Sequence, residues 1–167
     1  MEQEQLLKYW MTTYGDAILR MCYIYLKDYQ LAEDAVQETF LKAIKAYPSF
    51  QKKSSEKTWL IRIAINCCKN ISRIRWFRTK SIDQQQLANL PGVANIEEDF
   101  LKKDTVSGAI AALAPADKEM ILLYYYQDFT IKEIAAIIKK SENTTSQRLS
   151  RAKKRFKKIL LEVNQDE

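Results

Sequence analysis

The sequence predicts an all-α protein made of two small helical domains joined by a flexible linker. Three glycines and three prolines in 167 residues are too few for the tight turns of an all-β fold. Leu, Ile, Ala, Lys and Glu, which favour helices, are abundant. Apolar residues recur at helical spacing in two blocks, and the stretch SIDQQQLANLPGVANIEED between them has the composition of a linker. We therefore expect domains at 1–79 and 101–167 and a linker at 80–100.

The helices follow from this periodicity and from start and stop signals. The first block predicts helices at 3–12, 14–27, 30–47 and 56–78, with Pro48 and a serine pair in the break before the last one. The second block predicts helices at 98–113, 116–126, 131–139 and 142–163. Pro115 suits a first helical turn, and Thr130 with Glu133 fits a capping box.

Charge and composition limit the function. A net charge of +6 and a pI near 9.1 favour an anionic partner such as nucleic acid or a membrane surface. The start MEQEQLLKYW does not resemble a signal peptide and no apolar run reaches the length of a membrane span, so we expect a cytoplasmic protein. Without histidine, a Gly-rich phosphate loop or a nucleophile constellation, we expect no enzyme, no cofactor and no small-molecule substrate. Cys22, Cys67 and Cys68 lack CxxC spacing, which predicts buried thiols rather than a zinc site.

The helices at 131–139 and 142–163 are joined by two or three residues around Lys140 and Ser141. So tight a connection predicts a helix-turn-helix, whose second helix can lie in the major groove of DNA. The inward stripe of that helix is Thr145, Leu149, Ala152, Phe156 and Ile159 or Leu160. The side chains left outside are Ser146, Gln147, Arg148, Ser150, Arg151 and Lys154. Gln and Arg contact base edges and the basic residues from Lys153 to Lys158 suit phosphates, so we expect DNA binding rather than a merely solvated face.

The helix at 30–47 has an acidic and polar stripe. It consists of Asp34, Gln37, Glu38, Leu41 and Lys45, while Ala32, Ala35, Val36, Ala43 and Tyr47 can face a core. In a basic protein such a stripe indicates contact with a basic protein surface. The alternative, which composition alone favours, is a solvated face with ion pairs such as Glu38 with Lys42.

The helix at 56–78 has a buried side and a basic side. The expected buried residues are Leu60, Ile63, Ala64, Cys67, Ile71 and Ile74. Opposite them lie Arg62, Asn66, Lys69, Asn70 and Arg73, with Trp59 at the edge and Lys52 and Lys53 in the preceding loop. Basic residues alternating with Asn beside an aromatic are typical of a surface that grips a phosphate backbone and stacks an unpaired base. Trp59 can equally be a core residue.

Three stretches of the sequence resemble one family. AEDAVQETFLKAIKAYPSF, SSEKTWLIRIAINCCKNISRIRW and ALAPADKEMILLYYYQDFTIKEIAAIIKKSENTTSQRLSRAKKRF are similar to the extracytoplasmic-function (ECF) group of bacterial sigma factors, the small initiation subunits of RNA polymerase. The resemblance spans about residues 6–160, and its strength lies in the order and spacing of the motifs. It implies a sigma region 2 domain at 1–79, a sigma region 4 domain at 101–167 and a factor that directs core enzyme to promoters without covalent chemistry of its own.

The resemblance also implies a role for each surface. The D-x-x-Q-E core at Asp34, Gln37 and Glu38, together with Leu41, would dock on the clamp helices of the largest polymerase subunit. The residues that would melt and read the minus-ten element are Lys52, Lys53, Trp59, Arg62, Asn66, Lys69, Asn70 and Arg73. The residues that would read the minus-thirty-five element are Thr144, Ser146, Gln147, Arg148, Ser150, Arg151 and Lys154. Further implied partners are the flap of the second-largest subunit and an anti-sigma factor.

The turn departs from the family's common pattern, G-T-V-x-S-R-L-x-R-A. Asn143 stands in place of Gly and tolerates a positive φ better than most residues. Thr145 replaces an inward Val, and its hydroxyl can bond back to a helix carbonyl. Ser146 and Gln147 replace a frequently basic residue and a Ser, which leaves the promoter sequence open.

Two other classes of protein compete with this interpretation. A stand-alone helix-turn-helix regulator would use its first block as a sensor, but a sensor needs neither the acidic stripe nor the basic helix with its aromatic. A helical protein resting on anionic membranes would expose Trp, Phe or Leu opposite its lysines, whereas here the apolar sides are needed for cores.

Overall fold

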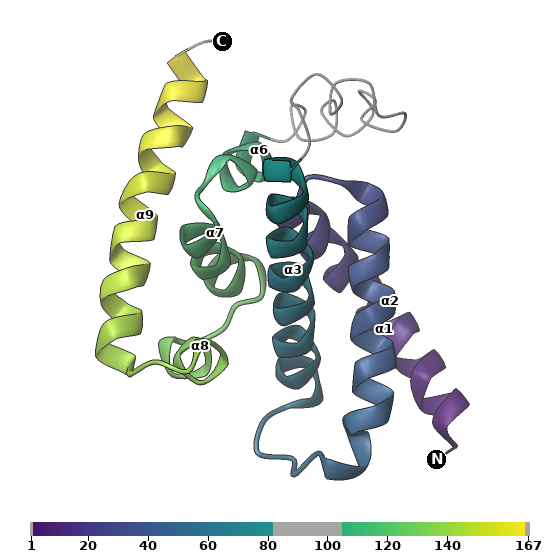
Figure 1. Cartoon of the computed structure of the whole chain (residues 1–167). Helices are drawn as coiled ribbons and strands as arrows, with labels where there is room; N and C mark the ends of the chain where they lie inside the picture. Colours follow the sequence, from purple (N-terminus) through teal and green to yellow (C-terminus); the bar gives the residue numbers. More distant parts are fainter. Residues whose placement is uncertain (1, 82–104, 166–167) are drawn as a thin grey trace. The chain divides into compact units, whose positions relative to one another are not determined.

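The protein is described by a computed structural model over residues 2–81 and 105–165 (Figure 1). Every regular element in these two ranges is a helix, and the chain divides into two compact units, 1–97 and 98–167. The predicted all-α, two-unit architecture is confirmed. The expected linker at 80–100 lies, apart from its first two residues, outside the described residues, as does the start of the helix expected at 98–113.

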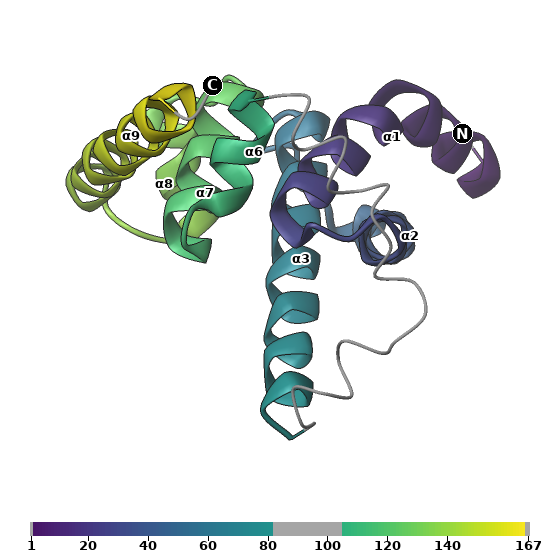
Figure 2. The same ribbon diagram turned by 90° about the horizontal axis from the view of Figure 1, so that it is seen from above.

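The first unit consists of three long helices that pack on one another. They are α1 (Gln3–Leu26), α2 (Tyr29–Ala46) and α3 (Glu56–Ser81), and a short 3-10 turn, Tyr47–Ser49, follows α2. The chain reverses at the loop after this turn, so α2 and α3 run antiparallel side by side (Figures 1 and 2). Fully buried large side chains fill the space between the three helices: Trp10, Ile18, Met21, Ile24, Leu60, Ile61 and Ile65.

The break expected near residue 13 is wrong, because α1 continues through it to Leu26. The hydroxyl of Thr12 donates to the Lys8 carbonyl at 2.8 Å, so this residue is accommodated within the helix. The helix ends at Lys27, whose backbone is left-handed at φ 56° and whose N–H donates to the Tyr23 carbonyl at 2.8 Å. Asp28 then caps α2, its carboxylate accepting from the N–H of Leu31 at 2.9 Å.

The predicted core sides are largely confirmed. Ala32, Ala35 and Ala43 of α2 and Leu60, Ala64 and Cys67 of α3 are buried, and Val36, Tyr47, Ile63 and Ile71 are half-buried. Ile74 is the exception at 53% exposed, because α1 ends beside this part of α3, where the Arg75 guanidinium donates to the Leu26 carbonyl at 3.1 Å. Thr39 and Phe40 add to the buried side of α2.

All three cysteines are buried free thiols, as expected. Burial raises the pKa of the Cys67 thiol. The pKa of the Cys68 thiol is also raised, first by its hydrogen bond with Cys22 and then by burial. The Cys67 and Cys68 thiols therefore remain protonated and pack as small apolar side chains.

The second unit is built around the long helix α9. Its elements are α6 (Thr105–Ala112), α7 (Pro115–Ile121), a π-helical turn (Leu122–Tyr126), α8 (Ile131–Ile138) and α9 (Glu142–Gln165). The three shorter helices all pack against α9 (Figure 1). Pro115 occupies the first turn of α7, as predicted. The capping box is also confirmed, because the Glu133 N–H donates to the Thr130 hydroxyl at 3.2 Å and the Thr130 N–H donates to the Glu133 carboxylate at 2.8 Å.

Candidate nucleic-acid interface

The turn between α8 and α9 is three residues long, Lys139 to Ser141, as the sequence predicts. Lys139 ends α8 in the left-handed conformation, at φ 56°. Ser141 then caps α9, its hydroxyl oxygen accepting from the N–H of Thr144 at 3.1 Å. The Thr145 hydroxyl donates to the Ser141 carbonyl at 2.8 Å, which is the back-bond expected for it. This geometry is that of a helix-turn-helix with α9 as its second helix.

The inward and outward sides of α9 lie where periodicity places them. Thr145, Leu149 and Ala152 are buried, and Phe156, Ile159 and Leu160 are half-buried. All six side chains predicted to face outward are exposed: Ser146, Gln147, Arg148, Ser150, Arg151 and Lys154. Thr144 is half-buried, and its hydroxyl oxygen accepts from the Ser141 hydroxyl at 2.9 Å. The exposed set therefore forms one polar and basic surface on the first half of α9.

Two cations of α9 interact within the unit, which the sequence did not indicate. The Lys153 amine lies 4.2 Å from the centre of the Tyr124 ring, a cation–π contact with the π-helical turn. The Arg155 guanidinium donates to both carboxylate oxygens of Asp117 at 2.9 Å. The Asp117 side chain is only 10% exposed, so this pair joins α9 to α7 in a partly dry site. Both residues were expected among the phosphate contacts, which stays a prediction, and each has a partner within the unit.

Asn143 does not adopt the positive φ that it could tolerate. Asn143 lies in the first turn of α9, within the helix that begins at Glu142. The left-handed residue of this turn is Lys139, four positions earlier. The chain therefore reverses direction before Ser141, and the family's Gly position falls inside the helix here.

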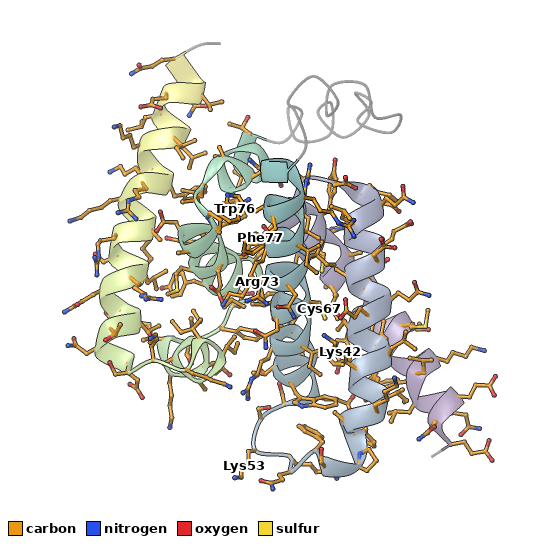
Figure 3. The ribbon with its side chains drawn as sticks, viewed as in Figure 1. Lys42, Lys53, Cys67, Arg73, Trp76 and Phe77 are labelled. Carbon is orange, nitrogen blue, oxygen red and sulfur yellow. The ribbon has the colours of Figure 1, made fainter. Side chains whose placement is uncertain are left out.

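The basic side of α3 is present in the first unit. Asn66, Lys69 and Arg73 are exposed, and Arg62 and Asn70 are half-buried. The Arg73 guanidinium donates to the Asn70 side-chain carbonyl at 2.9 Å, which orders both groups along the helix. In the loop before α3, Lys52 and Lys53 are exposed and Lys52 has a left-handed backbone at φ 52°. Figure 3 shows Lys53 at the end of the unit where this loop turns into α3.

Trp59 belongs to a cluster of four aromatic rings. Phe50 stacks on it with ring centres 4.6 Å apart, and Trp10 meets it edge to face at 5.9 Å. Tyr47 lies at 6.3 Å and also contacts Trp10 and Phe50. Trp10 is fully buried, and its indole N–H has no hydrogen-bond partner among the described residues. Trp59 is therefore a half-buried member of this cluster, with one ring face covered by Phe50.

The acidic stripe of α2 borders an apolar groove. Asp34, Gln37 and Leu41 are exposed, and the half-buried Glu38 pairs with Lys42 at 2.7 Å, as the sequence suggested. This hydrogen bond with Glu38 raises the pKa of Lys42. The groove has a volume of about 560 Å³ and lies between α1 and α2, lined by Met11, Leu19, Val36, Phe40 and Leu41 among others. Sequence reasoning missed the α1 wall, because it predicted no functional surface on residues 3–27.

Within residues 2–81 and 105–165, no three His, Cys, Asp or Glu side chains gather as they would around a metal ion. None of the helices in these ranges combines the length and the apolar composition needed to cross a membrane.

Comparison with known proteins identifies both units. The model of sigma-70 region 2 matches residues 10–78, and the model of sigma-70 region 4 matches residues 104–156. The ECF sigma factor SigX of Bacillus subtilis is 25% identical over 93% of this chain and 85% of its own length. The ECF sigma factor SigC of Mycobacterium tuberculosis is 32% identical over 77% of this chain and 70% of its own length.

Two solved structures share the fold. The sigma factor RpoE of Bartonella quintana, in complex with the anti-sigma factor NepR, matches with a TM-score of 0.70 and 23% identity over 92% of this chain and 95% of that one. CnrH in complex with the cytosolic domain of CnrY matches with a TM-score of 0.70 and 19% identity over 94% of this chain and 88% of that one. Two findings show the family. The two region models match in this order along the chain, and SigC is 32% identical over 70% of its own length. The chain belongs to the ECF group of the sigma-70 family of RNA polymerase sigma factors.

Proposed function

We propose that this sigma factor directs core RNA polymerase to its promoters through three separate surfaces. The exposed first half of α9 reads the minus-thirty-five element. The loop with Lys52 and Lys53 and the basic side of α3 bind and open the minus-ten element. The stripe Asp34, Gln37, Glu38 and Leu41 docks on the clamp helices of the largest polymerase subunit. The protein itself performs no covalent chemistry, and it works in the cytoplasm with its polymerase.

The observation that carries the proposal is that all six side chains predicted to face outward from α9 are exposed. A helix-turn-helix enters the major groove with the first turns of its second helix. In this chain those turns present Ser146, Gln147 and Arg148, and Gln and Arg form bidentate contacts with base edges. Arg151 and Lys154 follow on the same exposed side and suit phosphate contacts.

The groove beside α2 supports the proposed contact with the polymerase core. Leu41 is half exposed and Met11 is 56% exposed, and the groove that they line also includes Glu33 and Gln37 of α2. Protein interfaces combine such an apolar centre with a polar rim. We further propose contact of the second unit with the flap of the second-largest subunit, and control by an anti-sigma factor. The complex of RpoE with NepR supports the second of these.

The test is reconstitution with core RNA polymerase. The full chain should bind core enzyme and start transcription at a subset of duplex sites selected from a random library. Tight binding of such sites by the protein alone, without any affinity for core enzyme, would overturn the proposal in favour of a stand-alone regulator. The selected sites also supply the promoter whose sequence is otherwise unknown.

Charge reversal tests the core-binding surface. Glu38→Lys should weaken binding to core enzyme at least about tenfold, because it places like charges against a basic surface. Lys42→Ala breaks the same Glu38–Lys42 ion pair but leaves the carboxylate, so it should bind normally. Glu2→Lys makes the same charge change at an exposed position without a capping hydrogen bond and serves as the second control. Equal losses in Glu38→Lys and Glu2→Lys would contradict the assignment.

A further inference from the structure

The basic side of α3 continues into two exposed aromatic residues. At about 100° per residue, Trp76 falls on the line of Lys69 and Arg73, and Phe77 falls on the line of Asn70 and Arg73. Trp76 is 52% exposed and Phe77 is 60% exposed. Figure 3 shows Arg73, Trp76 and Phe77 on the half of α3 that leads away from the loop with Lys53. Two adjacent exposed aromatic side chains beside a basic stripe form a candidate contact surface.

This end of α3 is held in place and strongly basic. The Arg75 guanidinium donates to the carbonyl of Leu26 at 3.1 Å, which ties the turn to the end of α1. Arg73 and Arg78 are exposed on either side of the aromatic pair, and from Lys69 to Lys80 the sequence has five basic residues and no acidic one. The pKa of Lys27 is lowered, first by burial and then by the charge of the nearby Arg75. The charge of this patch is complementary to a polyanion.

The two exposed aromatic side chains contact each other. The two rings are 5.1 Å apart and nearly perpendicular, at 77°, so the edge of one ring covers a face of the other. Both rings are more than half exposed, so they present apolar surface within a basic patch. In duplex DNA the apolar group within reach of a side chain in the major groove is the thymine methyl.

We infer that Trp76 and Phe77 contact thymine methyl groups in duplex promoter DNA next to the segment that is opened, with Arg73 and Arg78 on the flanking phosphates. This inference rests on the proposed function, since it takes the side of α3 to face promoter DNA. Trp59 and Trp76 are seventeen residues apart on one helix, which is roughly 25 Å at the rise of an α-helix. That length corresponds to about seven stacked base pairs, so the contact lies outside the minus-ten element and adds selectivity there.

The experiment removes single methyl groups from the DNA. Holoenzyme is bound to a selected promoter duplex in which each thymine in turn, over ten base pairs on either side of the minus-ten element, is replaced by deoxyuracil. With the natural chain, one or two replacements beside the opened segment, about seven base pairs from the base nearest Trp59, should weaken binding roughly fourfold each, as expected for one buried methyl group. The same replacements should have no effect on holoenzyme carrying Trp76→Ala and Phe77→Ala. That double variant should bind the natural duplex roughly tenfold more weakly.

Matched variants separate this contact from other causes of weak binding. Tyr9→Ala removes an equally exposed aromatic from α1 and should leave both the affinity and the methyl effect unchanged. Both variants should bind core enzyme like the natural chain, and normal core binding shows that they are folded. Loss of core binding in the Trp76 and Phe77 variant would overturn the inference, because it would place the pair against the polymerase. A flat deoxyuracil scan, or a loss confined to templates with a single-stranded segment, would also overturn it. Failure of the natural chain to start transcription would instead refute the proposed function.

Discussion

At the scale of single residues, the cations of α9 divide into an exposed group and a group that contacts other helices of the same unit. Arg148, Arg151 and Lys154 are exposed, while Lys153 lies over Tyr124 and Arg155 is paired with Asp117. Within the run KKRFKK, Lys153 and Arg155 therefore contact other residues of their own unit, while Lys154, Lys157 and Lys158 are exposed.

Arg148→Ala tests whether this side chain reads a base. If its guanidinium makes a bidentate contact with a guanine, the variant should lose about 1–3 kcal/mol of discrimination at one base pair of the minus-thirty-five element. Lys154→Ala is the comparison, because a phosphate contact should weaken all sequences alike and reduce the salt dependence of binding by about one ion. Affinities of holoenzyme for single-base variants of the promoter give both quantities. A uniform loss in Arg148→Ala would place its side chain on phosphate.

Burial on α9 could be predicted from sequence, but the partners of its side chains could not. Helical periodicity alone separates Thr145, Leu149 and Ala152 from the exposed set, since one face of the helix must be covered. The positions of Lys153 and Arg155 depend on Tyr124 and Asp117, which come from the π-helical turn and from α7. Contacts over 29 or 38 residues are set by packing, and spacing within one helix does not contain them.

At the scale of elements, α1 shows how a weak local signal is overridden. Thr12, Thr13 and Gly15 disfavour helix and suggested a break. The helix nevertheless continues, because one continuous helix buries the side chains of Trp10, Ile18, Met21 and Ile24 together against α2 and α3. Burial of these side chains outweighs a cost of about 1 kcal/mol for the glycine.

Gly15→Ala should therefore stabilise the first unit. A Cβ built on Gly15 meets no atom within 4 Å beyond its chain neighbours and its own helix backbone, so the methyl group causes no clash. The variant should raise the free energy of unfolding of this unit by about 0.5–1 kcal/mol. Ala17→Gly, at an exposed position of the same helix, should lower it by a similar amount. Urea titration followed by tryptophan fluorescence measures both, and a loss of stability in Gly15→Ala would show that the helix needs glycine there.

The junction of α7 with α9 should depend on the Asp117–Arg155 pair. Asp117→Asn keeps the shape of the side chain but leaves Arg155 without a carboxylate, in a site where Asp117 is nearly buried. We expect the second unit to lose about 1–2 kcal/mol of stability, since Arg155 remains largely exposed and water screens part of the interaction. In a double-mutant cycle with Arg155→Met, the second substitution should cost little once the first is present. Additive losses would mean that the pair contributes no coupling.

At the scale of the whole molecule, the division into two helical units could be predicted because composition changes sharply at Ser81. Helix order and type were predictable for the same reason that the units are stable: each amphipathic helix has one face to bury. The groove between α1 and α2 and the aromatic cluster around Trp59 were not predictable. Both arise where residues of different helices meet, and the pattern of one helix does not show which residues of another helix lie beside it.

The two units should unfold as separate transitions that different probes can distinguish. All three tryptophans, Trp10, Trp59 and Trp76, belong to the first unit, so tryptophan fluorescence reports on that unit alone, whereas far-UV circular dichroism reports on helices of both. In urea titrations of the full chain, Asp117→Asn should shift only a part of the dichroism transition and leave the fluorescence midpoint where it was. Gly15→Ala should shift the fluorescence midpoint upward together with the remaining part of the dichroism signal. A shift of the fluorescence midpoint in Asp117→Asn would show that the two units unfold cooperatively, because the substituted residue belongs to the second unit and the tryptophans belong to the first.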